Sequence, residues 1–146
     1  LKFRDLEEAR KSCEQLLSQP FTLLNYLEGT RFTAEKHAKQ NSPYKNLLKP
    51  KAGGLALALS ILENEIDALV DMTIVYPDGV PDYGDFWLGG VSQIAVNLRK
   101  IEIPDWVRGG NYEDDAEYRE RFQKWVDQLW AEKDQLISEL KQKFST

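Results

Sequence analysis

Apolar side chains recur at regular spacing in several stretches of the chain, and the spacing differs between stretches. Residues 3–17 carry them every three or four positions, which predicts an amphipathic helix that ends before Pro20. Residues 21–27 form a short apolar, aromatic-rich run that favours a buried strand, and Gly29 ends it. Residues 55–62 are rich in alanine and leucine, so a second helix is expected there.

The middle of the chain carries two strand patterns separated by turn residues. Residues 69–77 predict a second buried strand that a proline closes, and residues 77–84 are rich in Pro, Asp and Gly, as turns are. Apolar side chains alternate along residues 94–103, but their parity changes near Arg99 and Lys100. The change predicts a strand with a bulge or a twist at that point.

The last stretch is the longest and predicts an amphipathic helix of roughly 30 residues. Its apolar stripe consists of Tyr118, Phe122, Trp125, Val126, Leu129, Trp130, Leu136, Ile137, Leu140 and Phe144. Asp114, Asp115 and Glu117 suit the helix N-terminus, and Lys141 and Lys143 suit its C-terminus. The stripe favours packing within the helix's own domain, with a lipid surface or a partner helix as the alternatives.

Strands that alternate with helices indicate the α/β class, with a mainly parallel or mixed sheet flanked by helices. The 146 residues are about one domain long, but the elements are too few for a complete doubly wound fold. Upstream strands are therefore expected to be missing. Because Leu1 already lies in a helical pattern, we expect a fragment or a processed piece.

Charge is unevenly distributed in this acidic chain. The net charge of −5 argues against sequence-independent nucleic-acid binding. Residues 31–51, the basic segment, form a polar loop in which one acid, Glu35, faces these bases: Arg31, Lys36, His37, Lys39, Lys45, Lys49 and Lys51. Such a segment suits a small anionic group or an anionic surface, although a solvated loop has the same pattern.

Several kinds of chemistry find no support in the sequence. Cys13 is the only cysteine, so it cannot form an internal disulfide, and a packed thiol in a reducing compartment is expected. His37, the only histidine, lies in a polar loop without a second His or Cys to complete a metal site, and no GxSxG elbow supports a Ser-His-Asp arrangement. No apolar run is long enough to span a bilayer.

The sequence EGTR directly follows the first predicted strand. Ligands of open α/β sheets bind beyond the carboxyl ends of strands, and Gly29 would allow close approach of a ligand to the backbone. Arg31 could donate two hydrogen bonds to a phosphate or carboxylate, and Glu28 could orient Arg31 or accept from a substrate hydroxyl. A surface turn with an ion pair would have the same four residues.

The sequence KPKAGG at residues 49–54 is a second candidate. Two lysines precede a glycine pair at a predicted helix start, where free backbone amides and the helix dipole favour anions. Taken alone, these residues are better explained as a helix cap after a basic loop.

Together these pieces resemble the lysophosphatidic acid acyltransferase superfamily, the PlsC-type glycerolipid acyltransferases. The sequence YLEGTR at residues 26–31 is similar to the family's aromatic-x-Glu-Gly-Thr-Arg block, although Leu27 stands where many members have proline. Residues 32–37 and 49–54 resemble blocks of a subgroup that includes the YihG-type bacterial acyltransferases and some eukaryotic lysophospholipid acyltransferases. Residues 73–77 resemble the last family block, a hydrophobic strand that ends in proline. The C-terminal helix is also similar, so the likeness runs nearly end to end.

The resemblance implies transfer of a fatty acyl group from acyl-CoA or acyl carrier protein to a lysophosphatidic-acid-like acceptor. It implies no cofactor beyond that thioester co-substrate, and no metal. Carried over residue by residue, Glu28, Gly29, Thr30 and Arg31 would hold the glycerol-phosphate end of the acceptor. Lys51 is a weaker candidate for the same phosphate.

The family's general base is a histidine followed five residues later by an aspartate, upstream of the acceptor block. Here Ser42 occupies the fifth position after His37, which itself follows the block. The resemblance therefore implies that residues 1–146 are the C-terminal part of one acyltransferase domain, inactive alone, without its catalytic pair and membrane anchor. A location at the cytoplasmic face of a bacterial inner membrane follows, with the fragment itself soluble.

Two interpretations without catalysis remain open. The basic segment and the C-terminal stripe would also suit a non-enzymatic module that binds anionic lipid or a partner helix. A truncated fold with an exposed apolar patch would suit helix-mediated oligomerisation.

Overall fold

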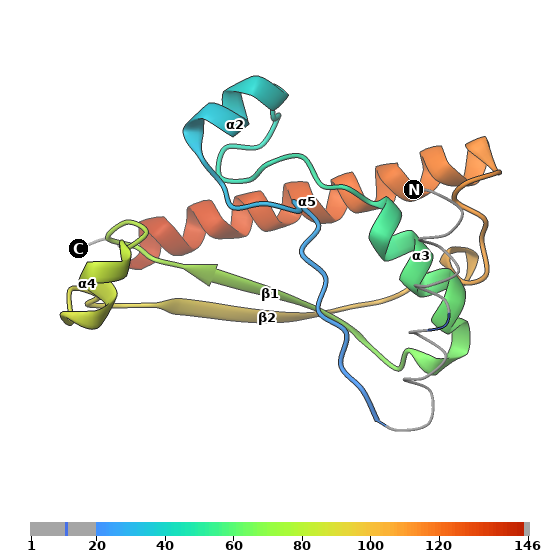
Figure 1. The fold of residues 1–146 in the computed structure, drawn as a ribbon, viewed down its shortest axis with the longest axis horizontal. Helices are drawn as coiled ribbons and strands as arrows, with labels where there is room; N and C mark the ends of the chain where they lie inside the picture. Colours follow the sequence, from blue (N-terminus) through green and yellow to red (C-terminus); the bar gives the residue numbers. More distant parts are fainter. Residues whose placement is uncertain (1–10, 12–19, 145–146) are drawn as a thin grey trace. The chain divides into compact units, whose positions relative to one another are not determined.

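The computed structural model describes residue 11 and residues 20–144. In chain order, its elements are α2 (Ala34–Gln40), α3 (Gly53–Leu62), η1 (Glu63–Glu65), β1 (Leu69–Val75), α4 (Tyr83–Trp87), β2 (Ala95–Ile101), η2 (Asp105–Val107) and α5 (Ala116–Phe144) (Figure 1). The mixed α/β class and the long C-terminal helix are confirmed. Apart from Lys11, the helix predicted over residues 3–17, which includes Cys13, lies outside the described residues.

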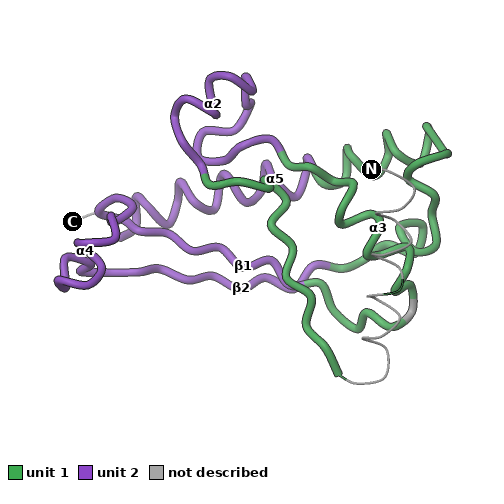
Figure 2. Tube along the Cα trace, viewed as in Figure 1, with its two compact units in different colours: residues 1–31, 50–69, 102–126 green, residues 32–49, 70–101, 127–146 purple. Residues whose placement is uncertain are grey.

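The chain divides into two compact units (Figure 2). Unit 1 comprises Leu1–Arg31, Pro50–Leu69 and Glu102–Val126, and unit 2 comprises Phe32–Lys49, Val70–Ile101 and Asp127–Thr146. Each unit thus combines three separate segments, and α5 contributes residues to both.

Unit 1 is built around α3 and the first part of α5. Its buried core consists of Ala52, Leu55, Ala56, Leu59, Val107, Phe122 and Val126. Phe122 is fully buried and meets the rings of Tyr112 and Trp125 at centroid distances of 5.7 Å and 5.4 Å, edge to face. Such ring contacts add to the free energy that burial alone supplies. The core of unit 1 is therefore apolar and largely aromatic.

The antiparallel pair β1 and β2 supplies the sheet of unit 2, and burial alternates along both strands. The buried positions are Thr73, Val75, Ala95 and Ile101. The opposite side, here named the outer sheet face, is 47–66% exposed and comprises Val70, Met72, Ile74, Val96 and Leu98. One side of each strand therefore packs inward while the other remains accessible.

The second part of α5 completes the core of unit 2. The apolar cluster there joins buried Tyr44, Leu47, Val75, Ala95 and Ile137 to the partly buried Trp130, Leu140 and Phe144. These helix residues come from the predicted stripe, as Phe122 and Val126 do in unit 1. The expectation that the stripe packs within the chain's own fold is confirmed.

Polar contacts fix the loop before α3 to this helix. The backbone amides of Lys45 and Asn46 donate to the Asp134 carboxylate at 2.9 Å and 2.6 Å. The Tyr44 hydroxyl donates to the backbone carbonyl of Asp127 at 3.3 Å. Burial, helped by the Asp127 carboxylate, raises the pKa of Tyr44 to about 12.

The buried strand predicted over residues 21–27 is wrong. Residues 21–26 form neither helix nor strand, and Leu23, Leu24 and Tyr26 are 46%, 69% and 81% exposed. A strand needs a neighbour for its backbone N–H and C=O groups, and in the described part of the chain β1 and β2 pair only with each other. The parallel pairing expected from strand–helix alternation is consequently not found within residues 20–144.

The predictions for the segments of two short helices and for a bulge in β2 were also wrong. The predicted basic loop contains α2, which begins after Thr33, whose hydroxyl accepts from the Lys36 amide at 3.2 Å. The turn-rich stretch contains α4. Burial alternates along β2 without a break, so the parity change near Arg99 does not mark a bulge. It arises because apolar side chains occupy both faces of the strand.

Candidate functional site

The EGTR sequence lies in a tight turn of unit 1. The Gly29 amide donates to the Tyr26 carbonyl at 2.9 Å, which closes a turn over residues 26–29. Gly29 has φ of +66°, in the left-handed region that residues with a Cβ avoid. The conformation of this turn therefore favours glycine at position 29, whether or not a ligand binds there.

Lys51 contacts this turn through both its backbone and its side chain. The Lys51 amide donates to the Leu27 carbonyl at 2.7 Å. A Cβ placed on Gly29 would lie 3.5 Å from Lys51 Nζ and 3.6 Å from its Cδ, so the lysine side chain runs alongside the glycine. The structure thus brings together two of the sequence-predicted candidates, and it places an ammonium group at the turn.

The remaining residues of the motif sit on the accessible side of unit 1. Glu28 is half-buried, whereas Thr30 and Arg31 are exposed. Arg31 does not stand at the end of a buried strand, because the preceding segment is not a strand. Arg31 instead follows the turn at residues 26–29, and the segment before that turn is apolar but exposed. Its role in binding a phosphate remains a prediction.

Directly after Lys51, α3 begins at the predicted glycine pair. Its N-cap, Ala52, makes no side-chain hydrogen bond to the first turn. The first amides of a helix have no partner within the helix, and the dipole adds a partial positive charge there. Lys51 therefore places positive charge beside Gly29, and the start of α3 follows Lys51 in the sequence. A Cβ at Gly54 would meet its nearest neighbour, Asn25 Nδ2, at 3.7 Å, an ordinary contact, so the glycine is not required by lack of space.

The rest of the basic segment belongs to unit 2. Residues 32–49 fall in that unit, whereas Arg31 and Lys51 fall in unit 1, so the segment is not one continuous patch of either unit. The Nε2 atom of His37 lies 2.6 Å from the Tyr44 carbonyl oxygen, and its ring centroid lies 5.5 Å from that of Phe32. These contacts support a structural role for His37 in holding the loop that contains Tyr44. Lys49 donates its amide to the Gln40 side chain at 3.1 Å.

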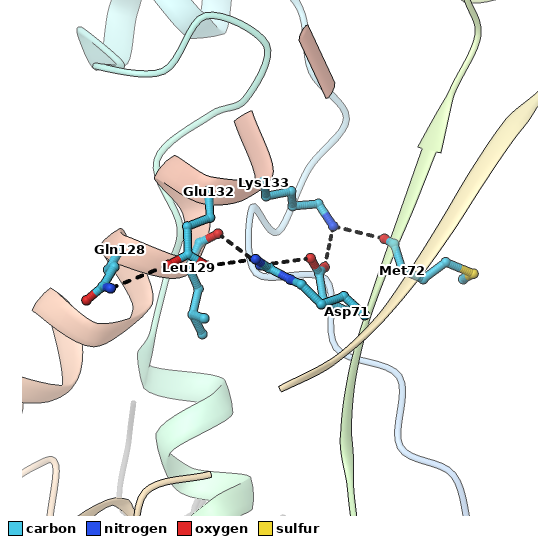
Figure 3. Close-up of polar contacts among 7 residues, drawn as sticks. Asp71, Met72, Gln128, Leu129, Glu132 and Lys133 are labelled. Atoms are coloured by element: carbon cyan, nitrogen blue, oxygen red, sulfur yellow. Dashed lines mark hydrogen bonds and ion pairs between the residues drawn. The ribbon is translucent and has the colours of Figure 1, made fainter. Parts of the chain in front are cut away.

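An ion network in unit 2 was not foreseen from the sequence (Figure 3). Arg99 contacts Glu132 at 2.6 Å and Asp71 at 3.4 Å, and Lys133 binds the same Asp71 carboxylate and the Met72 carbonyl. Lys133 and Asp71 are only 12% and 17% exposed. Two cations face two anions, so the network leaves no net charge to attract a ligand. A charged residue at an inward position of an alternating strand is the signal that could have revealed it.

Within residues 20–144, no group of three His, Cys, Asp or Glu side chains is arranged to hold a metal ion. None of the described helices combines the length and the apolar character needed to cross a bilayer.

Sequence comparison finds several curated relatives. The chain is 30% identical over 130 residues to 2-acyl-1-lysophosphatidylinositol acyltransferase of Saccharomyces cerevisiae, which covers 81% of the chain and 32% of the relative. It is 29% identical over 131 residues to lysocardiolipin acyltransferase 1 of Gallus gallus (83% and 33%). It is 28% identical over 141 residues to 1-acyl-sn-glycerol-3-phosphate acyltransferase delta of Mus musculus (90% and 35%).

The chain thus spans about a third of the length of these relatives. Neither a protein-family model nor a solved structure matches it. These three relatives are eukaryotic, so the bacterial subgroup and the inner-membrane location remain predictions.

Proposed function

Because the chain belongs to the lysophosphatidic acid acyltransferase superfamily, we propose that it is the acceptor-binding part of an acyltransferase of phospholipid biosynthesis. The observation that carries the proposal is the contact of Lys51 with the glycine of the EGTR turn, in a chain whose relatives all act on lysophospholipids by name. The acceptors in those names differ in their headgroups, but every one contains a phosphate and a free hydroxyl.

The shared phosphate explains why positive charge belongs at this turn. Arg31 can donate two parallel hydrogen bonds to phosphate oxygens, and Lys51 contributes a compact ammonium group beside Gly29. The start of α3 would add its free amides to the same anion. In this proposal Glu28 orients Arg31 or accepts from the acceptor hydroxyl, and Thr30 contributes its own hydroxyl.

The proposed reaction joins the acceptor to a fatty acyl group. A base removes the proton of the acceptor hydroxyl, the oxygen attacks the thioester carbonyl, and the protonated thiol of acyl-CoA or acyl carrier protein leaves. The expected base is a histidine with an aspartate five residues later, and these 146 residues contain no such pair. His37 is engaged with the Tyr44 carbonyl, which supports a structural role for it. We therefore expect the chain to bind acceptor but not to turn it over alone.

A direct test measures binding of soluble, short-chain lysophosphatidic acid to the 146-residue chain. Arg31→Ala and Lys51→Ala should each weaken binding roughly tenfold, about 1.4 kcal/mol, because each removes one cation from the phosphate. Lys100→Ala is the matched control, since it removes an exposed lysine from β2 in unit 2. Monoacylglycerol, which lacks the phosphate, should bind weakly to all variants. Equal binding of the two lipids would refute the proposed phosphate site.

The structure weakens the alternative that this chain is a non-enzymatic module that binds anionic lipid or a partner helix. It relied on an accessible apolar stripe along α5, yet Phe122, Val126 and Ile137 of that stripe are buried in the cores of the two units. It also relied on a continuous basic segment, and residues 32–49 belong to a different unit from Arg31 and Lys51. An anionic-lipid or partner-helix module is therefore the weaker proposal.

A further inference from the structure

The connection between β1 and β2 exposes large apolar side chains at its end. We call residues 77–93 the hairpin tip, which contains α4 (Figure 1). Val80, Tyr83, Trp87 and Leu88 are 84%, 82%, 72% and 88% exposed, and Phe86 is 56% exposed. A soluble surface rarely gathers this much apolar area in one short segment unless something covers it.

The tip has the composition of a membrane-interface element. Tyr83 and Trp87 stand one helical turn apart, with ring centroids separated by 6.3 Å. Tyrosine and tryptophan combine an apolar ring with one polar group, and they concentrate where bilayer hydrocarbon meets the headgroups. Val80 and Leu88 are purely apolar and even more exposed. Side chains that project this far are suited to penetration of a deformable surface.

The charge of the hairpin tip limits the kinds of membrane surface that it can bind. Residues 76–98 contain no Lys, Arg or His, and their three charged residues are all aspartates. A negatively charged tip is repelled by anionic lipid and by nucleic acid. Zwitterionic headgroups carry an ammonium group on their outer side, which complements aspartates that remain at the surface. The tip therefore fits a neutral, zwitterionic bilayer better than an anionic one.

We propose that the hairpin tip inserts into zwitterionic bilayers, with Trp87 and Leu88 entering the acyl region and Tyr83 at headgroup depth. Insertion would bring the chain to the surface in which lysophospholipids reside. The inference goes beyond the acceptor site and does not depend on it, because the tip lies in unit 2 and the EGTR turn lies in unit 1. Loss of one activity can thus be distinguished from loss of the other.

The test uses the whole chain and vesicles of phosphatidylcholine, with binding measured by flotation. The double variant Trp87→Ala with Leu88→Ala should lower the vesicle partition coefficient about tenfold or more, since both side chains lose their transfer into hydrocarbon. The matched control is Val96→Ala with Leu98→Ala, which removes exposed apolar groups from the outer sheet face and should bind like the parent. Circular dichroism melting confirms that both variants fold.

Lipid charge and salt separate this mechanism from its rivals. Binding should persist at high salt, because it rests mainly on transfer of apolar side chains into the bilayer rather than on ion pairing. Addition of phosphatidylserine should weaken it. Binding that appears only with phosphatidylserine and disappears in salt would assign membrane contact to basic residues and overturn the proposal. Absence of binding to phosphatidylcholine would overturn it as well. A dimer seen by light scattering without vesicles, and abolished by the double variant, would make a second copy the occupant instead.

Discussion

The two units of this chain have interiors of different chemistry. The core of unit 1 is apolar, with Phe122 enclosed by aromatic rings. In unit 2 an apolar cluster shares the interior with ion pairs among Asp71, Arg99, Glu132 and Lys133. Thr73 Oγ1 and Arg99 Nε are buried there without a hydrogen-bond partner among the described residues. Unit 1 should therefore be most sensitive to lost volume, and unit 2 to lost charge balance.

Loss of volume in unit 1 should have the largest effect. Phe122→Ala removes a fully buried ring and leaves a cavity, so we expect the free energy of unfolding to fall by about 3–5 kcal/mol. Urea denaturation followed by circular dichroism measures the change. Phe86→Ala, at a side chain that is 56% exposed, is the control and should change the free energy of unfolding little. Similar losses for the two variants would show that the aromatic core is not what stabilises unit 1.

Loss of one charge in unit 2 should cause the second-largest decrease in the free energy of unfolding. Asp71→Asn removes the carboxylate that Arg99 and Lys133 share, so Arg99 keeps its ion pair with Glu132 but the partly buried Lys133 loses its carboxylate partner. We expect a cost of about 2–4 kcal/mol by the same measurement. Glu120→Gln is the matched control, because its pair with Lys124 is more than two-thirds exposed on both sides and should contribute nothing measurable. If the two substitutions cost the same, the network of unit 2 behaves as ordinary surface charge.

The smallest effect is expected at the turn of the candidate site. Gly29→Ala forces a Cβ into a left-handed conformation, at a cost of about 1–2 kcal/mol. Gly54→Ala should be neutral or slightly stabilising, because helix α3 has space for the methyl group. Calorimetric melting of both variants compares them directly. A tolerated alanine at position 29 would contradict the conformational reason given for this glycine.

Long elements were predictable from the sequence, and short or unpaired ones were not. The periodicity of α5 extends along one whole face of the helix, so spacing located it, whereas α3 was located by its alanine and leucine content. The run at residues 21–27 is as apolar as β1, yet whether such a run becomes a strand depends on a neighbour that periodicity cannot reveal. The helices α2 and α4 are too short to produce a visible stripe.

The candidate site was predictable as a set of residues rather than as a geometry. Gly29 and Lys51 were identified from two separate family blocks, and their separation in the sequence does not predict that they contact each other. Their meeting depends on the backbone hydrogen bond from Lys51 to Leu27, a tertiary contact between two loops. The ion pair of Asp71 with Lys133 was hidden for the same reason, since its partners lie on a strand and on a distant helix.

The alternation of the chain between its two units has a consequence for synthesis. The core of unit 1 needs Phe122 and Val126, and that of unit 2 needs Ile137, all from α5, which follows the other described elements in the sequence. On the ribosome, neither core can close until this last helix has left the exit tunnel. The nascent polypeptide must therefore keep its apolar segments unpaired until α5 has been synthesised, so premature termination before Phe122 should yield an unfolded product rather than a half-folded one.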